Sequence, residues 1–350
     1  MLKAWIARLL EGRSLAAEEA EEAMRAVVSG EASPVQVGAY LIALRLKGET
    51  AAEILGSARV VRESLTPVVT SRTGLLDTCG TGGDGSRSFN VSTAAALVCA
   101  GAGLAVAKHG NRSVSSRCGS ADLLEACGVR LDLTAEEVAR VLEETGIGFL
   151  FAPALNGAMA AVAPVRRELG QRTIFNLLGP LANPAGATRQ LLGVYDAKWV
   201  EPLAEVLRGL GSERALVVHG LDGPAGPGGL DEISISGPTR AALLERGQVA
   251  LRTLTPESFG VQPRPPGSIA GGDPGENRER LASVLAGRPG PLRDAVVANA
   301  GAALWVGEAA RDPFEGARLA EKAIDSGAAA AALDRLVEAS ARVAAARGAP

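Results

Sequence analysis

Two glycine-rich loops carry the side chains of this sequence that are best suited to chemistry. The first reads GTGGD at residues 80–84, and about 25 residues later the second reads KHGNRSVSS at residues 108–116. Glycine lets a backbone approach a ligand closely, amide N–H groups can donate to phosphate oxygens, and lysine and arginine supply positive charge. Neither loop has the Gly-Lys-Ser/Thr ending of a Walker A motif or the G-x-G-x-x-G spacing of a Rossmann turn. Together they predict a site for a heavily phosphorylated ligand.

The segments around these loops must bring them into one site. Each loop follows a short apolar run, Leu75-Leu76 before the first and residues 104–107 before the second, and helical patterns begin near Ser92 and Asp122. Strands that alternate with helices favour a mostly parallel sheet, whose ligands bind at the carboxyl ends of the strands. We therefore expect an α/β fold with both loops at the same edge of one sheet.

Helical patterns alone fill the N-terminal part, to about residue 69. Ser33 is an N-cap followed by proline and a capping-box glutamine, and the helix that it opens should stop at Gly48. Thr50 begins a second capping box. These signals predict a small helical bundle. The C-terminal third is alanine-rich, and we predict that it is helical too.

Composition narrows the class of protein. The 350 residues can bury a large core and suggest two domains or one large one. The formal net charge is −3 with basic residues spread along the chain, which argues against a nucleic-acid partner. No apolar run approaches the ~20 residues of a membrane span, and the N-terminus has no signal-peptide core. The four cysteines form no C-x-x-C pair, so we expect reduced thiols in a cytoplasmic protein.

Seven ordered blocks of sequence point to a particular family. They read GTGGDGSRSFNVST (80–93), KHGNRSVSS (108–116), GSADLLEACG (119–128), FLFAP (149–153), PVRRELGQRTIFNLLGPLANP (164–184), VVHG (217–220) and LDEIS (230–234). From about residue 20 to about residue 340, the chain resembles the anthranilate phosphoribosyltransferases. The resemblance implies transfer of the phosphoribosyl group of phosphoribosyl pyrophosphate to the amine of anthranilate, in tryptophan biosynthesis, with Mg²⁺ as cofactor.

The resemblance also implies an architecture. A small helical domain would comprise residues 1–70 with a returning segment at about 165–190. A large α/β domain would comprise residues 71–164 and 191–345, with a mostly parallel sheet flanked by helices. In this family the helical segment also contributes to a subunit interface, so we expect a homodimer.

The family's substrate-binding positions can be carried over residue by residue. They fall on Gly80, Gly83, Asp84, Ser88, Asn90, Val91, Ser92, Thr93, Lys108, His109, Gly110, Asn111, Arg112, Ser113, Val114, Ser115, Ser116, Ser120 and Arg166. Of these, the resemblance makes Lys108, Asn111 and Arg166 catalytic, and Arg166 would pair with the anthranilate carboxylate. A guanidinium fork matches a carboxylate with two parallel hydrogen bonds, which lysine cannot copy.

Three of these positions carry further expectations. Lys108 should stand at a strand end and face the site. Ser120 should cap the next helix and touch the pyrophosphate. His109 has two open interpretations, a catalytic base or a loop histidine satisfied by backbone hydrogen bonds.

The same resemblance implies that Asp231 and Glu232 bind the metal ion, together with Ser92. Adjacent carboxylates on a loop usually form only a solvated turn. Mg²⁺ nonetheless favours one or two carboxylates plus ligand phosphates and water over a cage made only of protein. We therefore expect a magnesium site at this pair.

Two departures from the family pattern concern the acceptor and the metal. Asn156 stands where the family commonly has histidine, and asparagine can hydrogen-bond but cannot titrate. We expect it to line the acceptor's approach. Catalysis should survive, because the arylamine is neutral near pH 7, but the affinity for the acceptor or its identity stays open. The segment 222–229 is longer and richer in glycine and proline than usual, and we expect a mobile lid there.

Other functions fit parts of the sequence. A phosphoribosyltransferase for another aromatic carboxylate is compatible with Asn156. A pyrimidine nucleoside phosphorylase would share the two-domain architecture but should not need the acidic pair at 231–232. Distant relatives of the fold bind nucleic acid, which the mild acidity of this chain disfavours.

Overall fold

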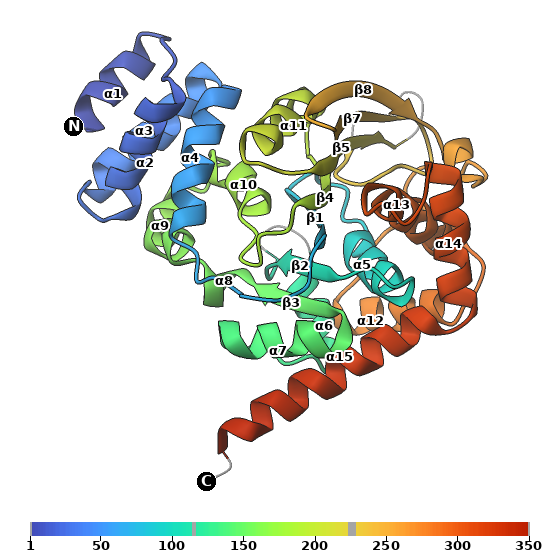
Figure 1. Cartoon of the computed structure of the whole chain (residues 1–350). Coiled ribbons are helices and arrows are strands. Elements are labelled where there is room, and N and C mark those ends of the chain that lie inside the picture. The colour runs from blue at the N-terminus through green and yellow to red at the C-terminus, as the bar shows by residue number, and fades with distance from the viewer. Residues whose placement is uncertain (1, 114–116, 223–228, 349–350) are drawn as a thin grey trace.

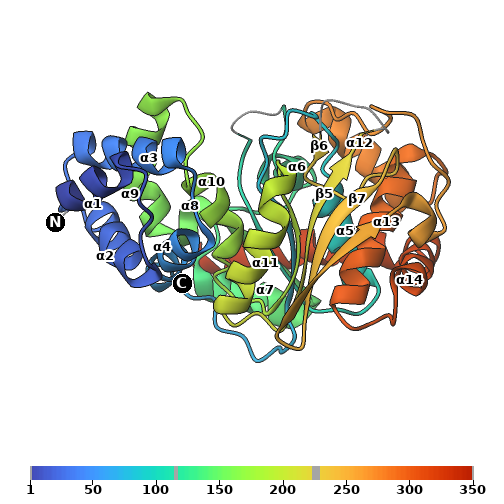
Figure 2. The ribbon, with the colours of Figure 1, turned by 90° about the horizontal axis from the view of Figure 1, so that it is seen from above.

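The computed structural model describes residues 2–113, 117–222 and 229–348. Figure 1 shows the N-terminal helices beside a larger part in which helices surround a sheet. The view from above in Figure 2 shows the same two parts side by side. Across these described ranges, no helix has the length and apolar character that a membrane crossing requires.

The N-terminal part is a helical bundle, as predicted. Its helices are α1 (Leu2–Leu10), α2 (Ala17–Val28), α3 (Pro34–Lys47) and α4 (Ala51–Glu63). The side chains of Ser33 and Thr50 accept the amide three residues on, and Gly48 ends α3 with a φ of 90°. Two later helices, α9 (Gly157–Leu169) and α10 (Phe175–Leu178), return to this bundle, where α9 packs against α2 and α3.

An eight-stranded sheet forms the centre of the larger part. Its strands are β1 (Leu76–Gly80), β2 (Val106–Gly110), β3 (Ile147–Phe151), β4 (Arg189–Gly193), β5 (Arg214–Leu221), β6 (Gly229–Leu230), β7 (Thr239–Glu245) and β8 (Gln248–Leu254). The order is β3-β2-β1-β4-β5-β7-β8, with β6 beside the end of β5. The first five strands are parallel, and β6, β7 and β8 are antiparallel. The mostly parallel sheet is therefore confirmed, and both glycine loops follow neighbouring parallel strands.

Both faces of the sheet are buried, which is typical of parallel sheets. Along β5, Leu216 and Val218 point into one hydrophobic cluster, whereas Ala215 and Val217 point into the other. The first cluster contains α5 (Val91–Gly101), α13 (Pro291–Val306), α14 (Pro313–Asp325) and α15 (Ala328–Ala345). The second contains α11 (Val200–Gly209) and the N-terminal helices. The helical bundle thus packs close to one face of the sheet.

The prediction of a helical C-terminal third is wrong for two strands. β7 and β8 lie within it and extend the sheet beyond β5. Residues 239–245 read TRAALLE, and alanine and leucine are strong helix formers. Pairing with the buried strand β5 outweighs this local preference.

Candidate active site

The first glycine loop turns directly after β1. Gly82 and Gly83 have φ angles of 64° and 74°, in the left-handed region that favours glycine. A Cβ atom on Gly80 would lie 2.4 Å from Asp231 Oδ2, so the position of Asp231 requires glycine there. The N–H groups of Gly83 and Asp84 have no acceptor within the described residues. These two amides can therefore donate to a ligand.

Two distant side chains hold this loop. The N–H of Gly82 donates to Asp231 Oδ2 at 2.6 Å. The carbonyl of Gly83 accepts a hydrogen bond from the Arg172 guanidinium. Sequence reasoning missed Arg172, because nothing in a lone arginine reveals a partner 89 residues away.

Polar side chains continue from the loop into α5. Asn90 donates to the carbonyl of Cys118 at 3.0 Å and accepts from Asn277 at 2.9 Å. Its side chain therefore links the start of α5, after the first glycine loop, to Cys118, which follows the second loop. Thr93 is buried, and its Oγ1 has no partner among the residues described. The amide of Ser88 donates to Ser86 Oγ at 3.2 Å.

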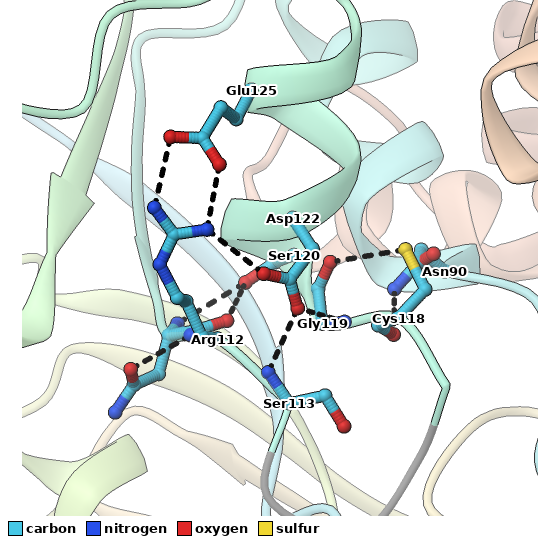
Figure 3. Close-up of polar contacts among 9 residues, drawn as sticks. Asn90, Arg112, Ser113, Cys118, Gly119, Ser120, Asp122 and Glu125 are labelled. Atoms are coloured by element: carbon cyan, nitrogen blue, oxygen red, sulfur yellow. Dashed lines mark hydrogen bonds and ion pairs between the residues drawn. The ribbon is translucent and has the colours of Figure 1, made fainter. Parts of the chain in front are cut away.

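The second glycine loop is organised by two acidic residues on α6 (Ser120–Ala126), as Figure 3 shows. Asp122 Oδ2 accepts the N–H groups of Ser113 at 3.0 Å and Gly119 at 2.9 Å. Arg112 donates to Asp122 at 3.0 Å and, with two nitrogens, to Glu125 at 2.6 and 2.8 Å. Hydrogen bonds and charge from Glu125 and Asp122 raise the pKa of Arg112. The predicted site residues Val114, Ser115 and Ser116 lie outside the described residues.

The prediction that Ser120 caps α6 is wrong. Gly119 occupies the cap position, and Asp122 accepts its amide. Ser120 Oγ instead accepts the N–H of Asn111 at 3.2 Å. Ser120 therefore shapes the loop at Asn111, and a contact between Ser120 and pyrophosphate stays a prediction.

Lys108 lies inside β2 rather than at its end, which corrects the expected position. Its side chain is 3% exposed, and Nζ donates to the carbonyl of Thr78 at 2.5 Å. Burial raises the pKa values of Asp77 and Glu232, and the positive charge of Lys108 partly offsets both shifts. Lys108 thus lies within β2, before the carboxyl end of the strand, and from there it adds positive charge near the site.

Asp77 is a fully buried carboxylate that sequence reasoning missed. Its Oδ1 accepts the N–H of His109 at 3.1 Å, and its Oδ2 accepts from Asn183 Nδ2 at 2.9 Å. Asn183 also donates to the carbonyl of Ala107 at 2.8 Å. Asp77 therefore ties β1 to β2 and to the segment that returns from the helical bundle.

His109 is buried at the end of β2, and its Nε2 has no partner within the described part of the chain. Burial and the charge of Lys108 lower the pKa of His109 to about 4, and a backbone hydrogen bond at Gly179 opposes the shift only in part. The ring is therefore neutral near pH 7, too weak a base to be tuned for that pH. This favours a hydrogen-bonding role over general-base catalysis.

An acidic cluster lies between the first loop and β6. Burial and the nearby Asp84 carboxylate raise the pKa of Asp231 to about 7. Burial and the charge of Asp231 raise the pKa of Glu232, whose Oε1 accepts the N–H of Ser92 at 3.0 Å. A bound cation would stabilise the ionised forms of these crowded carboxylates. The oxygen atoms of Asp231 and Glu232 therefore fit Mg²⁺. Within the described ranges, no three acidic, histidine or cysteine side chains are grouped so that they could hold a metal ion by themselves.

Two glycines outside the predicted site let the acidic pair lie against the sheet. A Cβ atom on Gly193 would lie 1.6 Å from the carbonyl oxygen of Asp231. A Cβ atom on Gly220 would lie 2.5 Å from that of Glu232. Both positions therefore have to be glycine for the acidic pair to reach the first loop.

Arg166 projects from α9 and is half-buried. Its guanidinium lies 5.5 Å from the ring centroid of Phe175 and 3.8 Å from the sulfur of Met159. No carboxylate pairs with Arg166 in the ranges that the structure covers. Burial lowers the pKa of Arg166, because the guanidinium loses hydration without gaining a counter-ion. The neighbouring Arg167 is exposed.

The two departures from the family pattern have different outcomes. Asn156 is buried at the N-terminus of α9, where its Oδ1 accepts the N–H of Met159 at 3.1 Å. It therefore begins the helix that carries Arg166. The lid expected at 222–229 falls largely outside the described residues, which include only Asp222 and Gly229 of that segment.

Comparisons with known proteins agree on one family. The glycosyl transferase family, a/b domain, matches residues 72–330, and the glycosyl transferase family, helical bundle domain, matches residues 3–65. Anthranilate phosphoribosyltransferase of Symbiobacterium thermophilum is 54% identical, over 96% of this chain and 97% of its own. That of Moorella thermoacetica is 52% identical, over 96% and 98%.

Solved structures give the same result. The crystal structure of anthranilate phosphoribosyltransferase from Thermus thermophilus has a TM-score of 0.89 and 46% identity, covering 96% of this chain and 99% of that one. The Saccharomyces cerevisiae enzyme in complex with PRPP and Mg has a TM-score of 0.88 and 27% identity, covering 97% and 98%. The resemblance found in the sequence is thereby confirmed, and the chain belongs to the anthranilate phosphoribosyltransferase family of glycosyl transferases.

Proposed function

We propose that this protein transfers the phosphoribosyl group of 5-phosphoribosyl 1-pyrophosphate to the amine of anthranilate, with release of pyrophosphate. This reaction is the second step of tryptophan biosynthesis. Relatives that are about half identical over nearly the whole chain bear the name of this activity. Solved relatives were obtained with PRPP and Mg and with 4-fluoroanthranilate.

The observation that carries the proposal is the unpaired guanidinium of Arg166. A half-buried arginine beside an aromatic ring, without a carboxylate partner in the described chain, suits a ligand that is both aromatic and anionic. Anthranilate has both properties. Its carboxylate would supply the counter-ion that Arg166 lacks, and its amine would be held at a fixed place.

The donor fits the two glycine loops. The free N–H groups of Gly83 and Asp84 can donate to pyrophosphate oxygens, and the second loop brings Arg112 and several hydroxyl groups. Both loops follow neighbouring strands β1 and β2, so one ligand can reach both. We assign the pyrophosphate to the first loop and the phosphoribosyl group to the second.

The enzyme uses Mg²⁺, as the yeast relative's complex with PRPP and Mg supports. Asp231, Glu232 and Ser92 would hold the ion in this chain. When bound, Mg²⁺ neutralises charge on the pyrophosphate leaving group. The raised pKa values of Asp231 and Glu232 support this role, because a cation would stabilise the ionised carboxylates.

The reaction then requires orientation more than covalent chemistry. The bond between the anomeric carbon and the pyrophosphate oxygen breaks as the amine nitrogen bonds to that carbon, and the nitrogen then releases one proton to water. Arg166 holds the acceptor, the loop amides hold the leaving group, and the buried Lys108 adds positive charge beneath the site. Such positioning and electrostatic effects supply most of the rate in reactions of this kind.

A steady-state assay tests the reaction directly. With phosphoribosyl pyrophosphate and Mg²⁺ present, loss of anthranilate fluorescence should be saturable at micromolar anthranilate. No consumption, with donor binding still seen by calorimetry, would point to a different aromatic acid as acceptor.

Arg166→Ala tests the acceptor site within the same assay. We expect the anthranilate KM to rise by about 30- to 100-fold, because a charge-assisted pair is lost, while the donor KM changes little. Arg167→Ala, the neighbouring exposed arginine, is the matched control and should leave both values unchanged. Equal increases in both KM values for Arg166→Ala would remove Arg166 from the acceptor site.

For the architecture, we propose a helical domain of residues 1–70 with the returning segment at about 165–190. Residues 71–164 and 191–345 form the α/β domain. The packing of α9 against α2 and α3 supports this division. We also place the protein in the cytoplasm, which the free thiols of Cys79, Cys99 and Cys127 support.

A homodimer through the helical domain completes the proposal. Three large apolar side chains on α1 and α3 are exposed, Leu10 at 69%, Val35 at 82% and Leu46 at 77%. Exposed apolar side chains of this size suit a protein–protein contact. Light scattering after size-exclusion chromatography should give twice the chain mass, and Val35→Glu with Leu46→Glu should reduce it to one. A monomeric wild type would refute the dimer.

A further inference from the structure

Arg172 lies between the helical bundle and the first glycine loop and contacts both. It follows α9 by three residues, on the segment that returns to the bundle. One guanidinium nitrogen donates to the carbonyl oxygen of Gly83, and the guanidinium carbon lies 4.6 Å from the ring centroid of Tyr195. The backbone carbonyl of Arg172 accepts from Arg45 Nη1 on α3 at 2.7 Å. A single residue therefore joins the bundle to the loop.

The contact with Gly83 determines how the next amide is oriented. In a trans peptide, the C=O of one residue and the N–H of the next point in opposite directions. When Arg172 holds the carbonyl of Gly83, the N–H of Asp84 is directed away from Arg172. Glycine would otherwise let this peptide rotate easily, because its φ and ψ angles are little restricted.

Tyr195 gives Arg172 a fixed support. Its backbone N–H donates to Thr81 Oγ1 at 3.0 Å, and its hydroxyl accepts from the indole of Trp199 at 3.0 Å. The ring under the guanidinium is thus held both to the first loop and to the start of α11. A guanidinium stacked on such a ring is pre-ordered for its hydrogen bond to Gly83.

The other side of the loop is held by a different partner. The N–H of Gly82 donates to Asp231 Oδ2, so the Thr81–Gly82 and Gly83–Asp84 peptides of the loop are fixed by two different parts of the fold. Asp231 belongs to the acidic pair, whereas Arg172 belongs to the segment that carries the acceptor arginine Arg166. The loop is therefore in contact with both the metal-binding and the acceptor-binding parts.

We propose that Arg172 is a positioning residue for the donor: it fixes the Gly83–Asp84 peptide with the Asp84 N–H directed at the pyrophosphate. It does so from the segment that also carries Arg166, so that donor affinity depends on the docking of the helical bundle. This inference rests on the assignment of the first loop to pyrophosphate.

Arg172→Ala is the primary test, in steady-state assays and in calorimetric titrations of phosphoribosyl pyrophosphate with Mg²⁺. We expect the donor KM and Kd to rise about tenfold, with the anthranilate KM within about twofold of wild type. Arg172→Lys keeps a hydrogen-bond donor but loses the planar group that stacks on Tyr195. Its KM for phosphoribosyl pyrophosphate should therefore lie between those of wild type and Arg172→Ala. A merely structural role for Arg172 would lower the melting temperature without separating the two KM values.

Two further variants separate failure of this inference from failure of the loop assignment. Gly83→Ala strains the same peptide directly, because φ is 74° there, and should raise the donor KM strongly. Arg167→Ala is the matched surface control and should change neither KM. If Gly83→Ala raises the donor KM and Arg172→Ala does not, the role of Arg172 is overturned. If neither variant does so, the assignment of the loop to pyrophosphate is wrong, and the inference falls with it.

Discussion

The first glycine loop is held by residues far away in the sequence, whereas residues 111–113 of the second loop are held by near neighbours. Asp231 and Arg172, which bind the first loop, are separated from their partners by 149 and 89 positions. Asp122 and Glu125, which bind the second, are at most 13 positions from theirs. Both loops nevertheless follow adjacent parallel strands and serve one proposed ligand.

This difference indicates that the two loops acquire their conformations in different ways. Residues 111–113 of the second loop can take their shape whenever α6 forms, because their side-chain acceptors lie on that helix. The first loop reaches its shape only when β6 and the segment after α9 are both in place. The conformation of the first loop therefore depends on the folding of distant segments of the chain, whereas that of residues 111–113 does not. Four experiments test this contrast between the loops.

The largest effect should come from the acidic pair that holds the first loop. Asp231→Asn with Glu232→Gln keeps an oxygen that can accept the Gly82 amide but removes the charge for Mg²⁺. We expect kcat to fall about 1000-fold, since a metal-supported charge interaction is worth several kcal/mol. The measurement is kcat across a Mg²⁺ titration, with the exposed Glu279→Gln as control. Full activity at saturating Mg²⁺ would rule out a metal role for the pair.

The histidine at the start of the second loop should give the next largest effect, on stability. The pKa of buried His109 is lowered from 6.5 to about 4, so below pH 6.5 the unfolded chain binds a proton that the folded chain does not. Stability is therefore lost as pH falls from 6.5 toward 4. Between pH 7.5 and pH 5 wild type should lose about 2 kcal/mol more than His109→Gln in urea unfolding. Equal losses would mean that the ring is protonated in the folded protein.

Asp122 should have a smaller effect, confined to donor binding. Its carboxylate ties the amides of Ser113 and Gly119 together, and Asp122→Ala releases both. We expect the donor KM to rise about tenfold, with the anthranilate KM nearly unchanged. A rise in both constants would contradict the view that the second loop is organised independently of the acceptor-binding part.

Glu125 should have the smallest effect of the four. It pairs with Arg112 at the protein surface, and exposed ion pairs contribute little. Glu125→Gln should therefore change the donor KM by less than about twofold. A change as large as that for Asp122→Ala would show that the charge of Arg112, rather than the two tied amides, sets the donor affinity.

Local sequence signals predicted most of the fold correctly. The capping boxes at Ser33 and Thr50 and the two strand-loop-helix units are where the sequence places them. The errors are cases in which distant pairing decides the outcome. The segment 239–245 forms a strand because β5 is its neighbour, although its composition favours a helix.

In the site, too, local motifs could be predicted from the sequence, whereas contacts between distant residues could not. Motif positions such as Gly80 and Asp231 could be carried over from the family, and the structure places them in contact. Asp77 and Arg172 could not be found from the sequence, because a single charged residue does not reveal its partner. Lys108 was expected at a strand end, yet it lies in the middle of β2, and its side chain donates to the carbonyl of Thr78 on the neighbouring strand β1.

The buried carboxylate of Asp77 has a consequence for the order of events during synthesis. Its two partners are the amide of His109 and the side chain of Asn183, which is 106 residues further on. A carboxylate is costly to bury until its partners are present, so β1 has to stay hydrated while the ribosome makes the following hundred or so residues. We expect nascent chains that end before Asn183 to leave the β1 amides open to hydrogen exchange, and protection in such chains would disprove this order.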